Sequence, residues 1–174
     1  MELQILHIIQ GWHQEWLDAV MIFFTTLGNS GFCWIVLSVV LVVFPRIRKC
    51  GLSMLAAMAI TFIIGNLMMK NIFMRQRPFE VDTSVRLLIP APRDYSFPSG
   101  HTSSSFTAAT VLFCYYHRVG IVAFILAGVI AFSRMYFFVH YPTDILGGIV
   151  LGVLDACLVL QAVHAWEKRR AADV

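Results

Sequence analysis

Three short stretches concentrate the side chains of this sequence that could do chemistry. In the first, KNIFMRQRP, Lys70 and Arg77 lie seven residues apart, about two turns of an ideal helix. Because Pro78 disfavours helical geometry at Arg77, we expect the chain to turn there. Two long cationic side chains could then converge on one anion.

The second stretch, PSGH, has the residues of a helix start that suits an anion. Ser99, Gly100 and His101 lead directly into an apolar run. A first helical turn has unpaired N–H groups and a partial positive charge, and Gly100 permits close approach of its backbone. Ser99 adds a hydroxyl donor. An ordinary serine cap beside an uninvolved histidine fits this stretch equally well, so both interpretations stay open at this point.

The third stretch, SRMYFFVHYPTD, contains Arg134, His140 and Asp144. Pro142 is typical of a first helical turn. Four residues apart at a helix start, Asp144 can reach back to His140, and a carboxylate on one ring nitrogen leaves the other nitrogen free to attack. Together the three stretches supply three cations, a hydroxyl, two histidines and a carboxylate. That set suits a doubly charged phosphate between a nucleophile and a proton donor.

The composition indicates that membrane helices must position these residues. Of 174 residues, 59% are hydrophobic and 13% are charged, whereas a soluble domain has about 25% charged residues. A net charge of +3 is too small to imply nucleic acid. No signal peptide is expected, because the first residues contain neither Lys nor Arg and no small-residue cleavage site. Four cysteines without CxxC spacing are expected to be buried core residues: Cys33, Cys50, Cys114 and Cys157.

Six apolar runs predict an all-α polytopic membrane protein with six transmembrane helices. The runs are 16–27, 32–44, 52–70, 102–116, 119–137 and 142–166. The whole chain, 1–174, is expected to be a single membrane domain. Residues 1–15 are predicted to form an interfacial amphipathic helix, and residues 71–99 to form a long outward loop that carries site residues.

The distribution of Lys and Arg predicts the orientation. Positive charges follow the second, fourth and sixth runs, at Arg46, Arg48, Lys49, Arg118, Lys168, Arg169 and Arg170. We expect that side and both termini to be cytoplasmic, with the active site at the outer membrane face. The outward loop nevertheless keeps arginines, which either function there or are balanced by the acidic residues Glu80, Asp82 and Asp94. The loop arginines are Arg75, Arg77, Arg86 and Arg93.

The three stretches resemble the signature motifs of the type 2 phosphatidic acid phosphatase (PAP2) superfamily, K-x6-R-P, P-S-G-H and S-R-x5-H-x3-D. Every fixed position matches in order between Lys70 and Asp144, and the length is similar to that of small bacterial integral-membrane members. The resemblance implies a metal-independent lipid phosphatase of the bacterial inner membrane that uses no cofactor. Its implied substrate is phosphatidylglycerol phosphate, phosphatidic acid or undecaprenyl pyrophosphate.

The resemblance also implies a role for each motif residue. His140 would be the nucleophile that forms a phosphohistidine, and Asp144 would orient it. His101 would protonate the leaving oxygen and then activate water. The implied phosphate-binding residues are Lys70, Arg77, Ser99, Gly100 and Arg134. Positioned cations would take the place of a metal. The lipid bilayer is the other implied partner, and the oligomeric state stays open.

Other readings of the same residues are less complete. A serine hydrolase could use Ser99, His140 and Asp144 as a triad, but acyl transfer has no use for three cations around one point. A lipid phosphotransferase of the same fold, or a non-catalytic lipid-binding membrane protein, stays open, although complete motifs argue against the latter. Asp18 has no assigned role. Asp155 is expected to make a buried polar contact between helices.

Overall fold

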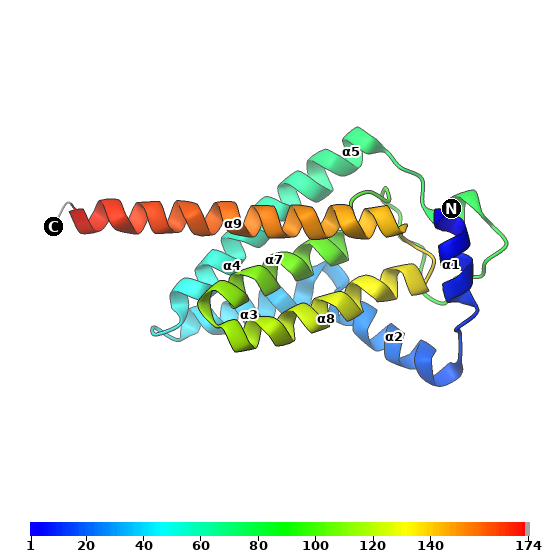
Figure 1. The fold of residues 1–174 in the computed structure, drawn as a ribbon, viewed down its shortest axis with the longest axis horizontal. Coiled ribbons are helices and arrows are strands. Elements are labelled where there is room, and N and C mark those ends of the chain that lie inside the picture. The colour runs from blue at the N-terminus through cyan, green and yellow to red at the C-terminus, as the bar shows by residue number, and fades with distance from the viewer. Residues whose placement is uncertain (173–174) are drawn as a thin grey trace.

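The computed structural model describes residues 1–172, and these residues contain helices and loops without any strand (Figure 1). The helices are α1 (Glu2–Gln10), α2 (Glu15–Leu27), α3 (Phe32–Val43), α4 (Arg48–Thr61), α5 (Lys70–Phe73), α6 (Pro78–Val81), α7 (Gly100–Tyr115), α8 (His117–Tyr136) and α9 (Pro142–Ala172). A 3-10 turn, η1 (Asn29–Gly31), links α2 to α3, and a π-helix, η2 (Phe62–Met69), links α4 to α5. The prediction of an all-α fold is confirmed.

Helix α7 lies inside the bundle and packs most extensively against α8 and α9 (Figure 1). Its hydroxyl groups contact the neighbouring helices: Trp34 donates to Ser105 Oγ at 2.9 Å, and the hydroxyl oxygens of Thr61 and Thr107 are 2.9 Å apart. Polar side chains commonly join helices in this way inside membranes, where water is absent. The hydroxyl-rich start of α7 therefore contributes to helix packing.

The close approach of α9 to α7 depends on two glycines. A Cβ atom at Gly148 would lie 2.9 Å from the carbonyl oxygen of Ser99, and one at Gly152 would lie 2.4 Å from the carbonyl oxygen of Ser103. On α9, exposed leucine and valine side chains recur every four residues, at Leu146, Val150, Leu154 and Leu158. Because residues four apart share one helix face, α9 has a packed glycine face and a separate apolar face toward lipid.

The helices differ in their ability to span a membrane. Three helical runs are long and apolar enough, namely Arg48–Val81, His117–Tyr136 and Pro142–Ala172. Helices α2 and α3, bent by 46° relative to each other, would together provide a fourth. Helix α7 has 16 residues, fewer than the roughly 20 that a span needs, and much of it is buried. The chain is thus a membrane protein, and the predicted count of six spans is not reproduced.

Helices α2 and α3 form one bent path, contrary to the prediction that each crosses the membrane separately. The path begins beside the end of α8, where the Tyr136 hydroxyl donates to Asp18, and it continues along α7, where Trp34 meets Ser105. With 13 and 12 residues, neither helix is long enough to cross alone. As a result, α1 and the C-terminal end of α9 lie at opposite ends of the bundle (Figure 1), and the structure does not support the prediction that both termini lie on one side.

Helix α1 lies across the end of the bundle where α9 begins (Figure 1). Its apolar face is buried: Leu6 packs with Phe138 and Tyr141, and Ile9 packs with Tyr136. On the other side Ile8 and Trp12 are exposed. The helix thus has one face packed on the bundle and one exposed face, and its location in the membrane interface stays a prediction.

Several side chains outside the motifs now have contacts. Asp18 accepts from Tyr136 and lies 2.7 Å from His13 Nδ1, which joins the start of α2 to the end of α8. Asp155 is buried in α9, but its Oδ2 has no hydrogen-bond partner within residues 1–172, so the expected interhelical contact is not made by that oxygen.

All four cysteines are free. Cys50 is buried as expected, whereas Cys114 is exposed, so the core prediction is wrong there.

Replacing Gly152 by Ala should destabilise the protein, because the new methyl group would press on the α7 backbone. We expect a loss of about 1–3 kcal/mol, the usual cost of overpacking a close contact. The matched control is Gly128→Ala on α8, where a Cβ atom would meet nothing within 4 Å; it should be neutral or stabilise by up to about 1 kcal/mol. Thermal unfolding in detergent measures both, and equal melting temperatures would contradict the proposed α7–α9 contact.

Candidate active site

A cavity of about 1030 Å³ inside the bundle brings charged and apolar groups together. Its apolar lining comes from α2, α3, α4 and the 71–99 loop, and includes Ile22, Ile35, Leu55, Met58, Leu88 and Ile89. Its lining also includes six of the predicted site residues: Lys70, Arg77, Gly100, His101, Arg134 and His140. Motif residues far apart in the sequence therefore share one cavity.

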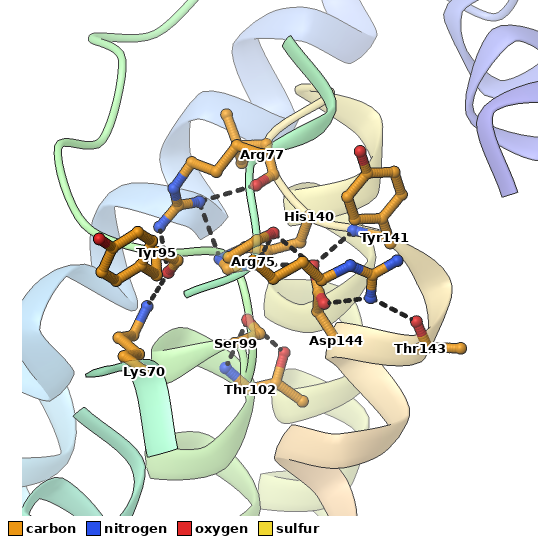
Figure 2. A network of polar contacts seen from close by, with 12 residues as sticks. Lys70, Arg75, Arg77, Tyr95, Ser99, Thr102, His140, Tyr141, Thr143 and Asp144 are labelled. Atoms are coloured by element: carbon orange, nitrogen blue, oxygen red, sulfur yellow. Dashed lines mark hydrogen bonds and ion pairs between the residues drawn. The ribbon is translucent and has the colours of Figure 1, made fainter. Parts of the chain in front are cut away.

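Lys70 and Arg77 converge as predicted, and a third residue joins them. Arg77 precedes Pro78 in an extended conformation, with φ −79° and ψ 156°, so the chain turns there. Lys70 and Arg77 are only 3% and 2% exposed. The carboxylate of Asp94 bridges them, with Oδ2 at 2.8 Å from Lys70 Nζ and Oδ1 at 2.7 Å from Arg77 Nη2. The backbone oxygen of Tyr95 accepts from Lys70 at 2.6 Å (Figure 2).

The charge state of Asp94 follows from these contacts. Burial raises the pKa of its carboxyl group, but the hydrogen bonds and positive charges of Lys70 and Arg77 outweigh burial and hold the pKa at about 2. Asp94 is therefore ionised at neutral pH. Its side chain is 53% exposed, so this anion lies at the edge of the cation pair and borders the cavity.

His140 and Asp144 form the pair that their spacing predicts. His140 Nδ1 lies 3.4 Å from Asp144 Oδ2, and Arg77 Nη1 donates to His140 Nε2 at 3.2 Å (Figure 2). Since a guanidinium group only donates, we assign the ring proton to Nδ1 and the lone pair to Nε2. Burial, and then the charges of Arg77, Arg134 and Lys70, lower the pKa of His140 well below its usual value. The ring is therefore neutral.

The carboxylate of Asp144 has three further partners that the sequence did not reveal. Its Oδ2 accepts from the Ser96 hydroxyl at 2.5 Å and from the backbone N–H of Tyr141 at 2.8 Å. Its Oδ1 accepts from Arg75 Nη1 at 2.6 Å (Figure 2). In the sequence, one feature points to a role for Arg75: it is among the arginines that the predicted outward loop keeps. Ser96 carries no comparable signal, because it is a single serine in a loop.

The Ser99 side chain caps the start of α7, which is one of the two interpretations that the sequence leaves open. Its Oγ accepts from the backbone N–H of Thr102 at 3.5 Å and from the Thr102 hydroxyl at 3.0 Å (Figure 2), and its side chain is fully buried. The backbone N–H of Ser99 donates to the carbonyl oxygen of Asp144 at 3.1 Å. This bond joins the starts of α7 and α9. It places Gly100 and His101, the next residues along the chain, at the cavity wall.

His101 and Arg134 lie at the α2–α3 side of the cavity. His101 Nε2 is 3.0 Å from Asn29 Oδ1 in the turn between those helices, and Arg134 donates to the Thr25 hydroxyl. Arg134 Nε is buried without a partner, and no carboxylate among residues 1–172 forms an ion pair with Arg134. The cavity thus contains an uncompensated cation opposite the Lys70–Arg77 pair.

The site has the chemistry needed to bind an anion and attack it. Three cations and the first turn of α7 can hold negatively charged oxygens. A neutral imidazole with its lone pair toward the cavity can act as a nucleophile, and a second histidine is available for proton transfer. Within the part of the chain that the structure describes, no three His, Cys, Asp or Glu side chains are grouped as a metal site would require.

Comparisons with known proteins identify the family. The PAP2 superfamily model matches residues 50–168. Undecaprenyl-diphosphatase of Sulfolobus acidocaldarius is 34% identical over 146 residues, which cover 83% of this chain and 70% of that protein. The crystal structure of a transmembrane PAP2 type phosphatidylglycerolphosphate phosphatase from Bacillus subtilis has a TM-score of 0.78 and 26% identity, over 94% of this chain and 85% of the other. Aquifex aeolicus LpxE has a TM-score of 0.78 and 28% identity, with coverage of 92% and 94%. The chain belongs to the PAP2 superfamily.

Proposed function

We propose that this protein is a membrane lipid phosphatase that hydrolyses a phosphate monoester or diphosphate through a phosphohistidine intermediate. One observation carries the proposal: a single cavity combines an apolar lining with three cations and a neutral histidine. Water-soluble phosphates would have no use for the apolar part, and a lipid-binding protein would have no use for a nucleophile. The names of relatives support lipid phosphate hydrolysis, since one is an undecaprenyl-diphosphatase and another is phosphatidylglycerophosphatase B of Bacillus subtilis.

In the first step, Nε2 of His140 attacks phosphorus and the bond from phosphorus to the lipid oxygen breaks. The negative charge of the bound phosphate favours the protonated form of His101, which gives its proton to that leaving oxygen. Asp144 accepts from Nδ1–H and stabilises the positive charge that the ring acquires. In the second step, His101 takes a proton from water, the resulting hydroxide attacks phosphorus, and the P–N bond breaks. Free phosphate leaves and His140 returns to its neutral form.

The cations supply the electrostatic part of catalysis. In this proposal Lys70, Arg77 and Arg134 contact the equatorial oxygens, where charge is spread in the transition state. Gly100 and the first turn of α7 add backbone donors. The buried hydroxyl of Ser99 acts by holding that turn in place. Because positioned cations do the work of a metal, activity should persist in EDTA.

The substrate is a lipid whose phosphate reaches this cluster while its chains occupy the apolar lining. Phosphatidylglycerol phosphate, phosphatidic acid and undecaprenyl pyrophosphate all meet that requirement. Phosphate release from purified protein in detergent, compared among the three lipids, identifies the preferred one. A protein that releases phosphate from none of them would contradict the proposed function.

The positive charges support a site that faces outward from a bacterial cytoplasmic membrane. Lys and Arg lie in the α3–α4 turn, at the start of α8 and near the end of α9, all at the end of the bundle away from the cavity (Figure 1). Such clusters favour the cytoplasmic side. The lipid would then be dephosphorylated in the outer leaflet, and α1 would lie on the outer side with the site.

Separate substitutions should distinguish the two histidines. His140→Ala should lose both turnover and the phosphoenzyme, because it removes the attacking nitrogen. His101→Ala should slow turnover by about 10² to 10⁴, yet with p-nitrophenyl phosphate, whose leaving group needs little protonation, it should still accumulate phosphohistidine. Rapid quench in alkali measures the acid-labile, alkali-stable phosphoenzyme. Label on His140→Ala, or an acid-stable phosphoserine, would show that the nucleophile is assigned wrongly.

Replacing Asp94 by Asn should tighten the binding of orthovanadate. Lys70 and Arg77 would lose their internal anion but keep the backbone acceptors that position them. The inhibition constant should fall about fivefold, since ion pairs at a partly exposed edge are worth about 1 kcal/mol. Asp82→Asn is the matched control, because Asp82 lies on the same loop but pairs with His7. Weaker vanadate binding in Asp94→Asn would mean that Asp94 is needed to position the cations.

Cysteine labelling tests the orientation. In a background without the four native cysteines, Thr83→Cys on the exposed outward loop should react with an impermeant maleimide in intact cells. Arg46→Cys, exposed in the α3–α4 turn, should react only after lysis. The reverse pattern would overturn the outward orientation without affecting the proposed chemistry.

A further inference from the structure

Arg75 lies between two carboxylates that belong to different parts of the fold. Its Nη1 donates to Asp144 Oδ1 and to the Thr143 hydroxyl oxygen, both at 2.6 Å (Figure 2). Its Nη2 donates to Glu2 Oε2 at 2.6 Å. The guanidinium group also lies 3.9 Å above the ring of Tyr141. Four residues from α1, α9 and the preceding loop therefore define one orientation of this side chain.

Glu2 completes this arrangement from the start of α1. Its Oε1 accepts from the backbone N–H of Thr143 at 3.1 Å and from the Thr143 hydroxyl at 2.7 Å, while its Oε2 accepts from Arg75. Burial raises the pKa of Glu2, but hydrogen bonds from Thr143 and Arg75 lower it further, so the carboxyl group is ionised. The buried side chains of Leu6 and Ile9 hold α1 against the end of α8 and the loop before α9.

The contacts divide the two oxygens of Asp144 between two tasks. Oδ2 faces His140 and accepts from Ser96 and from the Tyr141 backbone, whereas Oδ1 binds Arg75. A carboxylate held on one oxygen only could rotate and lose its alignment with the imidazole. The bond to Arg75 removes that freedom. In addition, the backbone oxygen of Arg75 accepts from the N–H of Ser96 at 2.9 Å, which places the serine hydroxyl as well.

We infer that Arg75 and Glu2 are positioning residues that hold the carboxylate of Asp144 in line with His140. The inference rests on the proposed roles of His140 and Asp144. Arg75 occupies a variable position of the K-x6-R-P motif, and Glu2 lies outside the residues that the family model matches. Neither side chain lines the cavity, so neither is placed to touch the substrate phosphate.

This placement predicts which kinetic constant changes. Arg75→Met should lower kcat by up to about 10²-fold, as expected when a reacting group is misaligned by roughly 1 Å. KM should change little, because the cavity and its three cations are intact. Arg75→Lys should recover part of kcat, since an ammonium group can reach one carboxylate but lacks the fork that joins both. Arg86→Met is the control for losing one cation from the same exposed loop.

The pH dependence separates positioning from a general loss of structure. The acid limb of kcat/KM reports the protonation of groups in the free enzyme, here His140. The charged or titratable groups that face His140 are Lys70, Arg77, His101, Arg134 and Asp144, and all are kept in these variants. Arg75→Met leaves the charge of Asp144 uncompensated, so the limb should move to higher pH. Glu2→Gln frees the charge of Arg75, so the limb should move to lower pH, whereas Glu15→Gln should leave it in place.

The experiment is steady-state kinetics of the full-length variants with p-nitrophenyl phosphate across pH, with thermal unfolding as a check on folding. Lower kcat at unchanged KM in Arg75→Met, together with opposite shifts in the two variants, supports the inference. If Arg75→Met does not fold, the test rests on whether the acid limb of kcat/KM moves to lower pH in Glu2→Gln. Wild-type kcat and an unshifted limb in these variants, beside an inactive His140→Ala, would overturn the inference and leave the proposed function standing. A fully active His140→Ala would instead overturn the proposed function.

Discussion

Three positively charged side chains, Lys70, Arg77 and Arg134, lie close together at one end of a helical bundle and repel one another. The other groups of the site have to compensate these charges. Taking a charged group out of water costs several kcal/mol unless other groups compensate it. For Lys70 and Arg77 the compensation comes from Asp94 and from backbone carbonyl oxygens. Within residues 1–172, Arg134 has the Thr25 hydroxyl as its side-chain partner and forms no ion pair. A bound phosphate would supply negative charge there, so the same cations would favour substrate binding.

The same cations determine the state of the nucleophile. Positive surroundings and burial disfavour protonated His140, so its Nε2 keeps the lone pair needed for attack. In the proposed mechanism the ring becomes positively charged once phosphorus is bound, and Asp144 and the phosphate oxygens would then stabilise it. The interactions would therefore improve as the reaction proceeds, which is what lowers a barrier. In this structure Arg77 donates to Nε2, a contact that it would exchange for a phosphate oxygen in the proposed mechanism.

Helix packing brings the two histidine-bearing segments together. Gly148 and Gly152 allow α9 to lie directly against the backbone of α7, and the bond from Ser99 N–H to the Asp144 carbonyl aligns the first turns of both helices. The start of α7, with its partial positive charge, lines the cavity at Gly100 and His101, and His140 lines it from just before α9. Helix α1 covers this end from outside and contributes Glu2 to the support of Asp144. The side of α9 that carries the exposed leucine and valine side chains takes no part in these contacts.

The sequence by itself determined the local features, which depend on residues close together along the chain. The turn before Pro78, the helix start at Pro142 and the approach of His140 to Asp144 follow from local backbone geometry, and composition alone indicated an all-helical membrane protein. Only the tertiary structure showed that the Ser99 hydroxyl is a buried cap, that Ser96 and Arg75 hold Asp144, and that Asp94 bridges the cations. Most of these contacts join segments that are remote in sequence. Hydropathy likewise marked α2 and α3 as apolar but could not place them on one bent path, because the direction of a short helix is decided by the surfaces against which it packs, here mainly α8 for α2 and α4 for α3.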